Sequence, residues 1–403
     1  MKDRKPELLA PAGNWSMLNA AIKAEADAVY LGVESLNMRA LAKNFELNEL
    51  PEIVKHCKDN GVDVHLTLNT IVYENELEEL EEIIIKAKAA GVDLVIGWDF
   101  SVIRLCKKHG VPFCISTQAS ISNSVSAEFF RQLGAKRIVL ARECSLDQIK
   151  EIKKKVDVEI EAFVHGAMCI AVSGRCFMSH EVFNKSANRG ECLQPCRREY
   201  EIKDSDEKFS MILGENYVLS PKDLCTIDFI ELLIEAGIDS FKIEGRKRSP
   251  EYIHKVVSAY RKAIDLYYEN KLNDEIKSEL KDELREVYNR GFSAGFYLGA
   301  PGEKDYAEAY GSLATTRKRF IGRVINYYKK NKVAHIVIDA DQLETGDELY
   351  IIGNTTGVVE LKVNSMLKDD EPKNKAVKGE DVTIYCEEKV RENDKVYKII
   401  KVN

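Results

Sequence analysis

Short runs of apolar residues alternate with longer amphipathic stretches between Pro6 and Arg246. The intervening stretches 48–61 and 74–91 carry apolar residues at three- and four-residue spacing and end in glycine, which is typical of capped helices. A strand followed by a helix, eight times over, predicts an α/β fold with a TIM-like eight-stranded parallel barrel inside a ring of helices. An open doubly wound sheet is the alternative, and the count of eight favours the barrel. The eight apolar runs are ELLAPAG, DAVYLGV, DVHLTLNT, DLVIGWD, PFCISTQAS, KRIVLAREC, EIEAFVHG and SFKIEGR.

The pattern changes after a segment rich in glycine and polar residues, 299–311. Beyond it, short runs of alternating apolar and polar residues such as FIGRVINYY and VAHIVID predict a small C-terminal antiparallel β-barrel. We therefore expect a TIM-like barrel domain over residues 1–302 and a small β-barrel domain over residues 310–403. A cysteine-rich insertion at about 166–215 is expected to interrupt the first domain after its seventh strand.

Polar side chains close most of the predicted strands. In a parallel barrel the chemistry lies at the carboxyl ends of the strands, so these side chains are expected to line one pocket. Each of them taken singly is also explained by helix capping or by pairing with a neighbour. The set comprises Asn69, Asp99, Gln118, Arg142, Glu143, His165, Glu244 and Arg246.

Four of the ten cysteines, Cys169, Cys176, Cys192 and Cys196, fall within twenty-eight residues after the predicted seventh strand. Structural zinc sites usually use close cysteine pairs in both halves, and only the second pair has that spacing. Four thiolates can also hold a [4Fe-4S] cluster, whose ligands the fold gathers from uneven spacings. The spacing favours iron–sulfur, while zinc and small buried cysteines remain alternatives.

The composition and charge of the chain narrow the class of protein. The 403 residues are 45% hydrophobic with a formal net charge of -7, which indicates a globular protein without a general attraction to nucleic acid. The N-terminus is charged and broken by prolines, and no apolar run reaches membrane-spanning length, so we expect a cytoplasmic protein without membrane contact. Basic residues gather locally beside the cysteines, and Arg197 and Arg198 are candidates for binding nucleic acid.

The stretch EAFVHGAMCIAVSGRCFMS, which begins at Glu161, resembles the signature of the collagenase-like peptidase family. Four further stretches are similar to blocks of that family, so the resemblance covers about three quarters of the chain. Length and a single C-terminal module make the chain most similar to the branch of tRNA hydroxylation protein P. The four stretches are ELLAPAGNWSMLNAAIKAEADAVYLGV, ANRGECLQPCRREY, SFKIEGRKRSPEYI and NRGFSAGFYLG.

The resemblance implies a cofactor, a reaction and two partners. It implies a [4Fe-4S] cluster on Cys169, Cys176, Cys192 and Cys196, and hydroxylation of the wobble uridine of tRNA at C5 with prephenate as co-substrate. Other members of the family hydroxylate a ribosomal RNA cytidine or ubiquinone precursors, so these substrates stay open.

The peptidase name of the family predicts a nucleophile or a metal-bound water, and the sequence offers little for either. HEVFN at His180 is the nearest approach to a zinc-protease motif, but Asn184 stands where the second histidine is needed. Proteolysis remains the alternative activity.

Within the expected pocket the residue types suggest roles. Prephenate carries two carboxylates, so Arg142 and Arg246 are candidates for bidentate binding, and Asn69 and Gln118 are further substrate-binding candidates. His165 is the candidate acid or base, with Glu244 as its partner.

Overall fold

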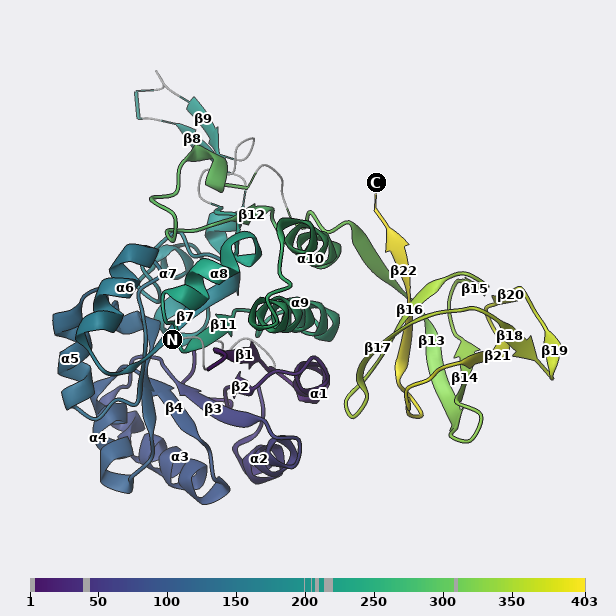
Figure 1. Cartoon of the computed structure of the whole chain (residues 1–403), viewed down its shortest axis with the longest axis horizontal. Helices are drawn as coiled ribbons and strands as arrows, with labels where there is room; N and C mark the ends of the chain where they lie inside the picture. Colours follow the sequence, from purple (N-terminus) through teal and green to yellow (C-terminus); the bar gives the residue numbers. More distant parts are fainter. Residues whose placement is uncertain are drawn as a thin grey trace.

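The computed structural model describes residues 4–38, 44–198, 200–203, 205–206, 210–213, 220–307 and 311–402. Eight parallel strands within these ranges form a closed barrel, because each pairs with the next and β11 pairs with both β7 and β1. The predicted TIM-like barrel is therefore confirmed, and the open sheet is excluded (Figure 1). The barrel strands are β1 (Glu7–Pro11), β2 (Ala28–Leu31), β3 (Asp63–Leu68), β4 (Leu94–Gly97), β5 (Phe113–Ile115), β6 (Arg137–Val139), β7 (Glu159–Gly166) and β11 (Ser240–Ile243).

Helices follow the strands and surround the barrel, and local capping explains where several of them begin and end. Asn14 accepts a hydrogen bond from the backbone N–H of Met17 at 3.0 Å, which fixes the start of α1. Gly91 and Gly110 take the left-handed conformation that ends α3 and α4. None of the described helices is both long and apolar enough to cross a membrane. The helices are α1 (Trp15–Lys23), α2 (Leu50–Asp59), α3 (Leu77–Ala90), α4 (Phe100–His109), α5 (Ser124–Gln132), α6 (Leu146–Lys155), α7 (Met178–Phe183), α8 (Ile230–Glu235), α9 (Pro250–Tyr268) and α10 (Asp274–Glu286).

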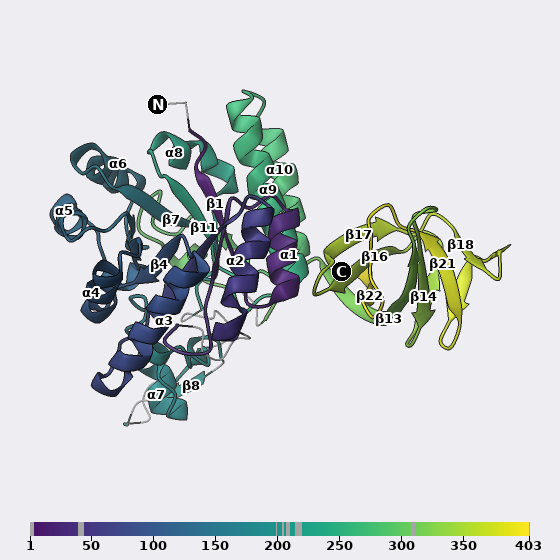
Figure 2. The same ribbon diagram turned by 90° about the horizontal axis from the view of Figure 1, so that it is seen from below.

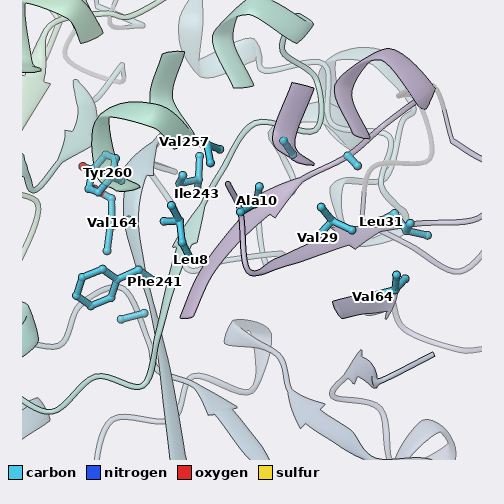
Figure 3. Close-up of a cluster of buried hydrophobic side chains, with 14 of the residues drawn as sticks. Leu8, Ala10, Val29, Leu31, Val64, Val164, Phe241, Ile243, Val257 and Tyr260 are labelled. Atoms are coloured by element: carbon cyan, nitrogen blue, oxygen red, sulfur yellow. Dashed lines mark hydrogen bonds between the residues drawn. The ribbon is translucent and has the colours of Figure 1, made fainter. Parts of the chain in front are cut away.

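The main hydrophobic core lies between the barrel strands and the helices. Strand residues such as Leu8, Val29 and Phe241 are fully buried there, and Val257 and Tyr260 of α9 pack against them (Figure 3). Successive residues of a strand point to opposite faces, so the neighbouring positions point into the barrel. A separate apolar cluster with Leu9, Tyr30, Ile96, Val139 and Phe163 fills that interior.

The cysteine-rich insertion follows β7 at the end of the barrel away from the N-terminus, where Figure 2 shows α7 and β8. The hairpin of β8 (Tyr200–Lys203) and β9 (Ser210–Leu213) projects from the barrel (Figure 1). The chain returns through β10 (Asp223–Cys225), which pairs antiparallel with β7, and β12 (Phe292–Ser293) pairs with β10. The sequence analysis missed these two strands, because both are shorter than the pattern of a strand requires.

The C-terminal part consists of antiparallel sheets around a hydrophobic core of their own, in agreement with the predicted fold class. An eight-stranded sheet has the order β17-β16-β22-β13-β14-β21-β18-β19, and β15 and β20 form a second sheet that shares its core. The strands are β13 (Thr316–Tyr328), β14 (Val333–Ile338), β15 (Gln342–Glu344), β16 (Glu348–Gly353), β17 (Gly357–Lys362), β18 (Met366–Lys368), β19 (Glu371–Pro372), β20 (Lys375–Val377), β21 (Asp381–Tyr385) and β22 (Lys395–Lys401).

The C-terminal sheets contact the barrel through α1, α9 and β17. Asn19 of α1 donates a hydrogen bond to the carbonyl of Asn354 at 2.8 Å. Gly357 has a positive φ of 69°, and a Cβ there would lie 2.8 Å from the carbonyl carbon of Asn19, so only glycine permits this approach. The contact lies on the side of the barrel, away from the cysteine-rich insertion (Figure 2).

Candidate functional site

A cavity of about 160 Å³ lies at the carboxyl ends of the barrel strands, under the cysteine-rich insertion. Strand-end residues from six different strands and residues of the insertion line it. The structure therefore brings together most of the side chains that the sequence analysis selected. The selected residues that line this cavity are Asn69, Gln118, Arg142, Glu244, Arg246, Arg197, Cys169, Cys176, Cys192 and Cys196.

Arg246 and Arg142 lie at the cavity on the two sides of its aromatic floor. Arg246 is nearly closed off from solvent and donates hydrogen bonds to Thr67 Oγ1 at 2.9 Å and Asn37 Oδ1 at 3.2 Å. Arg142 donates to the carbonyl of Ala167 at 2.7 Å, and its guanidinium lies 3.9 Å from the ring centroid of Phe163. Its buried Nε has no hydrogen-bond partner among the described residues.

The two amide side chains of Asn69 and Gln118 also line the cavity. Asn69 accepts a hydrogen bond from the backbone N–H of Met38 at 3.1 Å. Gln118 accepts one from the hydroxyl of Ser116 through its side-chain oxygen, and its own carbonyl accepts from Arg175 at 3.3 Å. In each amide the acceptor oxygen has a protein donor, while the amide N–H₂ group can donate to a ligand.

His165 is the one catalytic candidate that the structure does not bring to the cavity. The register of β7 against β11 shifts between Lys242 and Ile243, so Phe163 faces the barrel interior and His165 faces α9. Its Nδ1 lies 3.4 Å from the hydroxyl of Tyr260, and burial lowers the pKa of the imidazole to about 3. The expected pairing with the Glu244 side chain is therefore not found, because the β-bulge turns the ring away.

Acid is expected to destabilise the protein through this buried histidine. The folded-state pKa of about 3 lies below the ordinary value of 6.5, so the stability that neutral His165 provides is present above pH 6.5 and lost as the pH falls toward 3. Replacing His165→Gln should flatten the decline of the free energy of unfolding by about 1.4 kcal/mol per pH unit below pH 6. Denaturant titrations between pH 7 and pH 4.5 measure this slope. His180→Gln, at an exposed position, should leave the slope as in the parent, and equal slopes for all three proteins would contradict the assignment.

The four thiols of the insertion all line the cavity. Burial raises the pKa of Cys196; Arg197 opposes this shift, and the charges of Cys169, Cys192 and Cys176 add to it. Among the described residues, however, no three His, Cys, Asp or Glu side chains form a ready-made metal shell. Four thiols on the wall of one cavity suit iron–sulfur or zinc by donor type, and coordination requires their side chains to move closer. The other six cysteines of the chain are buried, as expected for small core residues.

Arg197 anchors the insertion to the barrel. Its guanidinium donates to Ser220 Oγ and to the carbonyl of Pro221, each at 2.9 Å, and also to the carbonyl of Met168. The chain next to Cys196 is thereby fastened to the residue before Cys169. Burial lowers the pKa of Arg197 to about 10, with the nearby charge of Arg290 acting in the same direction.

Two of the remaining strand-end residues, Asp99 and Glu143, do not line the cavity. Asp99 caps α4 by accepting from the N–H of Ser101 at 2.9 Å and also accepts from the N–H of Val72. Glu143 is exposed and is not part of the cavity wall. The helix-capping explanation therefore holds for Asp99.

Sequence reasoning missed three residues of the cavity floor: Tyr30, Phe163 and Lys242. The Tyr30 hydroxyl donates to the carbonyl of Ile243 at 2.9 Å and to Glu244 Oε2 at 3.2 Å. The signal for Lys242 was available, because a charged residue between Phe241 and Ile243 in a buried strand has no place in an ordinary apolar barrel core.

The sequence of the chain is similar to those of several known proteins. The model of peptidase family U32 matches residues 13–307. A protein of Porphyromonas gingivalis named collagenase is 40% identical over 98% of both chains. The tRNA hydroxylation protein P1 of Bacillus subtilis is 39% identical over 87% of this chain and 84% of its own. The 23S rRNA 5-hydroxycytidine C2501 synthase of Escherichia coli is 36% identical over 66% of this chain and 40% of its own.

The fold and site define an α/β-barrel protein whose cavity, at the carboxyl ends of the strands, is covered by a cysteine-rich insertion. The chain belongs to peptidase family U32, and the resemblance to collagenase-like peptidases is thereby confirmed.

Proposed function

We propose that the protein modifies RNA, and that its reaction is hydroxylation of the wobble uridine of tRNA at C5 with prephenate as co-substrate. The observation that carries the proposal is that four thiols and several cationic side chains line a single cavity. Relatives named for tRNA hydroxylation and for synthesis of a hydroxylated rRNA cytidine support RNA as the substrate class. Another RNA base or a quinone precursor would fit the same cavity chemistry, and the tests below separate them.

In this proposal Cys169, Cys176, Cys192 and Cys196 hold a [4Fe-4S] cluster. Such a cluster supplies one-electron transfer when it is bound. The residues of the chain bind and orient the reactants: Arg142 and Arg246 bind the carboxylates of prephenate, and Asn69 and Gln118 hydrogen-bond polar groups of the substrates. Glu244, held by the Tyr30 hydroxyl, is the carboxylate at the cavity that can hold or release a proton.

Exposed aromatic and basic side chains of the insertion offer a surface for the anticodon loop. The ring of Phe177 is 72% exposed beside the cluster cysteines, and the guanidinium of Arg198 lies 4.5 Å from the ring centroid of Phe183. Unpaired bases stack on such rings and guanidinium planes. Trp98 is half-buried and donates to the carbonyl of Asn69 at 3.0 Å, while the side chain of Tyr200 is outside the described part of the structure.

Arg198 and Arg197 are expected to differ sharply when each is replaced by alanine, although they are neighbours. Arg198→Ala removes an exposed cation, so tRNA binding should weaken and its logarithmic salt slope should fall by about one unit. Arg197→Ala removes the anchor of the insertion and should lower the melting temperature by about 3 °C or more. Filter binding at several salt concentrations and thermal melting measure the two effects. An unchanged salt slope for Arg198→Ala would move the RNA surface elsewhere.

A peptidase is the second candidate function, because a relative that spans the whole chain is named collagenase. The described residues do not form the metal site that a metallopeptidase needs. His180 is exposed on α7, and no ready-made metal shell is present among the described side chains. Incubation of the purified protein with unfolded collagen, with and without a chelator, tests this candidate.

The proposed function is tested most simply in cells of the source organism. Deletion of the gene should remove 5-hydroxyuridine and its derivatives from the wobble position, and the intact gene should restore them. Mass spectrometry of tRNA nucleosides gives the result, and the same digests of ribosomal RNA and a quinone analysis cover the two alternative substrates. An unchanged tRNA profile with a lost rRNA or quinone product would replace the tRNA assignment.

A further inference from the structure

Lys242 is a buried lysine on the floor of the cavity. It lies on β11 with only 5% of its surface exposed, and its Nζ lies 4.4 Å from the ring centroid of Tyr30 and 5.6 Å from that of Phe163. Its carboxylate partner is Glu161, 2.6 Å away and fully buried, which lies 3.5 Å from Arg137. Burying such charges costs stability, and barrel interiors are ordinarily filled by branched apolar side chains. A charged group retained at the base of a cavity therefore indicates a function.

Lys242 has N–H donors that the described residues do not use. An ammonium group has three N–H donors, and within the described residues Lys242 makes one hydrogen bond, to Glu161 Oε1. The rest of its surroundings are the faces of two aromatic rings, which attract a cation without accepting a conventional hydrogen bond. Because Lys242 lines the cavity, an acceptor placed there can take the remaining donors.

The charges around the cavity favour an anionic acceptor. Five cationic side chains line it, against a single carboxylate, Glu244, among the described residues. Three of the five follow the aromatic floor: Arg142 lies over Phe163, Lys242 between Phe163 and Tyr30, and Arg246 lies 5.7 Å from the Tyr30 centroid. The floor thus presents cations at both ends and in the middle, with flat apolar surface between them.

We infer that Lys242 is a further substrate-binding residue, which receives a carboxylate oxygen of a small organic acid bound against Tyr30 and Phe163. This inference rests on the proposed function, in which such an acid is the co-substrate. Glu161 acts as a positioning residue, because it accepts the hydrogen bond that holds the ammonium group at the floor. The RNA backbone is the other source of anionic oxygens, and the binding experiment separates it from the small acid.

The experiment compares binding of prephenate alone, by calorimetry, with binding of an anticodon stem-loop RNA alone. The variant Lys242→Met with Glu161→Gln removes the cation without leaving a buried unpaired carboxylate, and Lys242→Gln provides a second neutral variant that still donates to Glu161. Glu161→Gln alone keeps Lys242, whose hydrogen bond the glutamine side-chain oxygen can still accept. Arg137 also retains its contacts with Glu7 and Glu159 in this variant. Lys277→Met is the matched control, because Lys277 is a buried lysine of α10 paired with Glu231 away from the cavity.

The inference predicts that both variants without Lys242 bind prephenate at least about tenfold more weakly, as loss of a charge-assisted hydrogen bond implies. The affinity of these variants for RNA should stay within about twofold of the parent value. Glu161→Gln and Lys277→Met should show less than half of the loss in prephenate affinity that removal of Lys242 causes. Parent-like prephenate binding without Lys242, equal losses for Glu161→Gln, or loss of RNA binding alone would each overturn it. If the parent protein binds no prephenate, the inference also falls. If prephenate binding depends on Lys242 but no tRNA product forms, the proposed function fails while Lys242 keeps its role.

Discussion

Replacing Cys192→Ser is expected to abolish iron binding. Protein purified without oxygen should be brown and carry about four irons per chain, and the variant should be nearly colourless with about one iron or less. The reason is that Cys192 lies on the wall of the cavity with three other thiols, and a serine hydroxyl is a poor ligand for iron in a thiolate cluster. Iron and sulfide analysis together with the absorption spectrum give the result.

The control for this change is Cys57→Ser. Cys57 is a fully buried residue of α2, packed in the main core, so its replacement should leave the iron content unchanged. Equal loss of iron from both variants would mean that the ligand assignment is wrong. Stoichiometric zinc in a colourless, active parent protein would instead establish the zinc alternative.

Replacing Arg246→Lys is expected to reduce kcat/KM roughly 100-fold, with the iron content unchanged. The guanidinium donates to Thr67 and Asn37 and lies beside the Tyr30 ring, so its planar fork is fixed in one orientation. Lysine keeps the charge but cannot reproduce that geometry. Arg142→Lys should raise the half-saturating prephenate concentration by a smaller factor, because Arg142 is only partly buried.

Arg261→Lys separates the role of Arg246 from a general need for buried arginines. Arg261 lies on α9, with Asp27 at 3.0 Å and Asp265 at 3.2 Å. Its replacement should lower the melting temperature by as much as Arg246→Lys does, while the folded protein keeps its activity. Activity and prephenate dependence equal to those of the parent in both Arg246→Lys and Arg142→Lys would exclude these residues from acid binding.

The barrel could be predicted from the sequence because each strand is a short apolar run and each helix has the matching periodicity. All eight predicted runs contain a barrel strand. Strands β10 and β12 could not be found in this way, since they have three and two residues and form only because β7 extends beyond the barrel toward the insertion. Their pairing depends on tertiary contacts and not on a local pattern.

The candidate site could be predicted only as far as side-chain direction follows from a regular strand. The ends of β3, β5 and β6 place Asn69, Gln118 and Arg142 at the cavity, as the barrel geometry requires. At His165 a β-bulge reverses the direction, and no local sequence signal marks that bulge. Arg197 carries charge like its neighbour Arg198, yet three oxygen atoms of the fold hold it, which the sequence alone does not reveal.

The most direct measurement uses the purified protein itself. Iron-containing protein purified without oxygen is incubated with an anticodon stem-loop RNA that carries an unmodified wobble uridine, with and without prephenate. A two-electron acceptor is present in every reaction, because hydroxylation of C5 removes two electrons from the base, and the RNA nucleosides are analysed by mass spectrometry. The account predicts a uridine heavier by one oxygen atom with prephenate present, and none with Cys192→Ser. An unchanged RNA in every reaction, together with iron-independent cleavage of unfolded collagen by the same preparation, would contradict it.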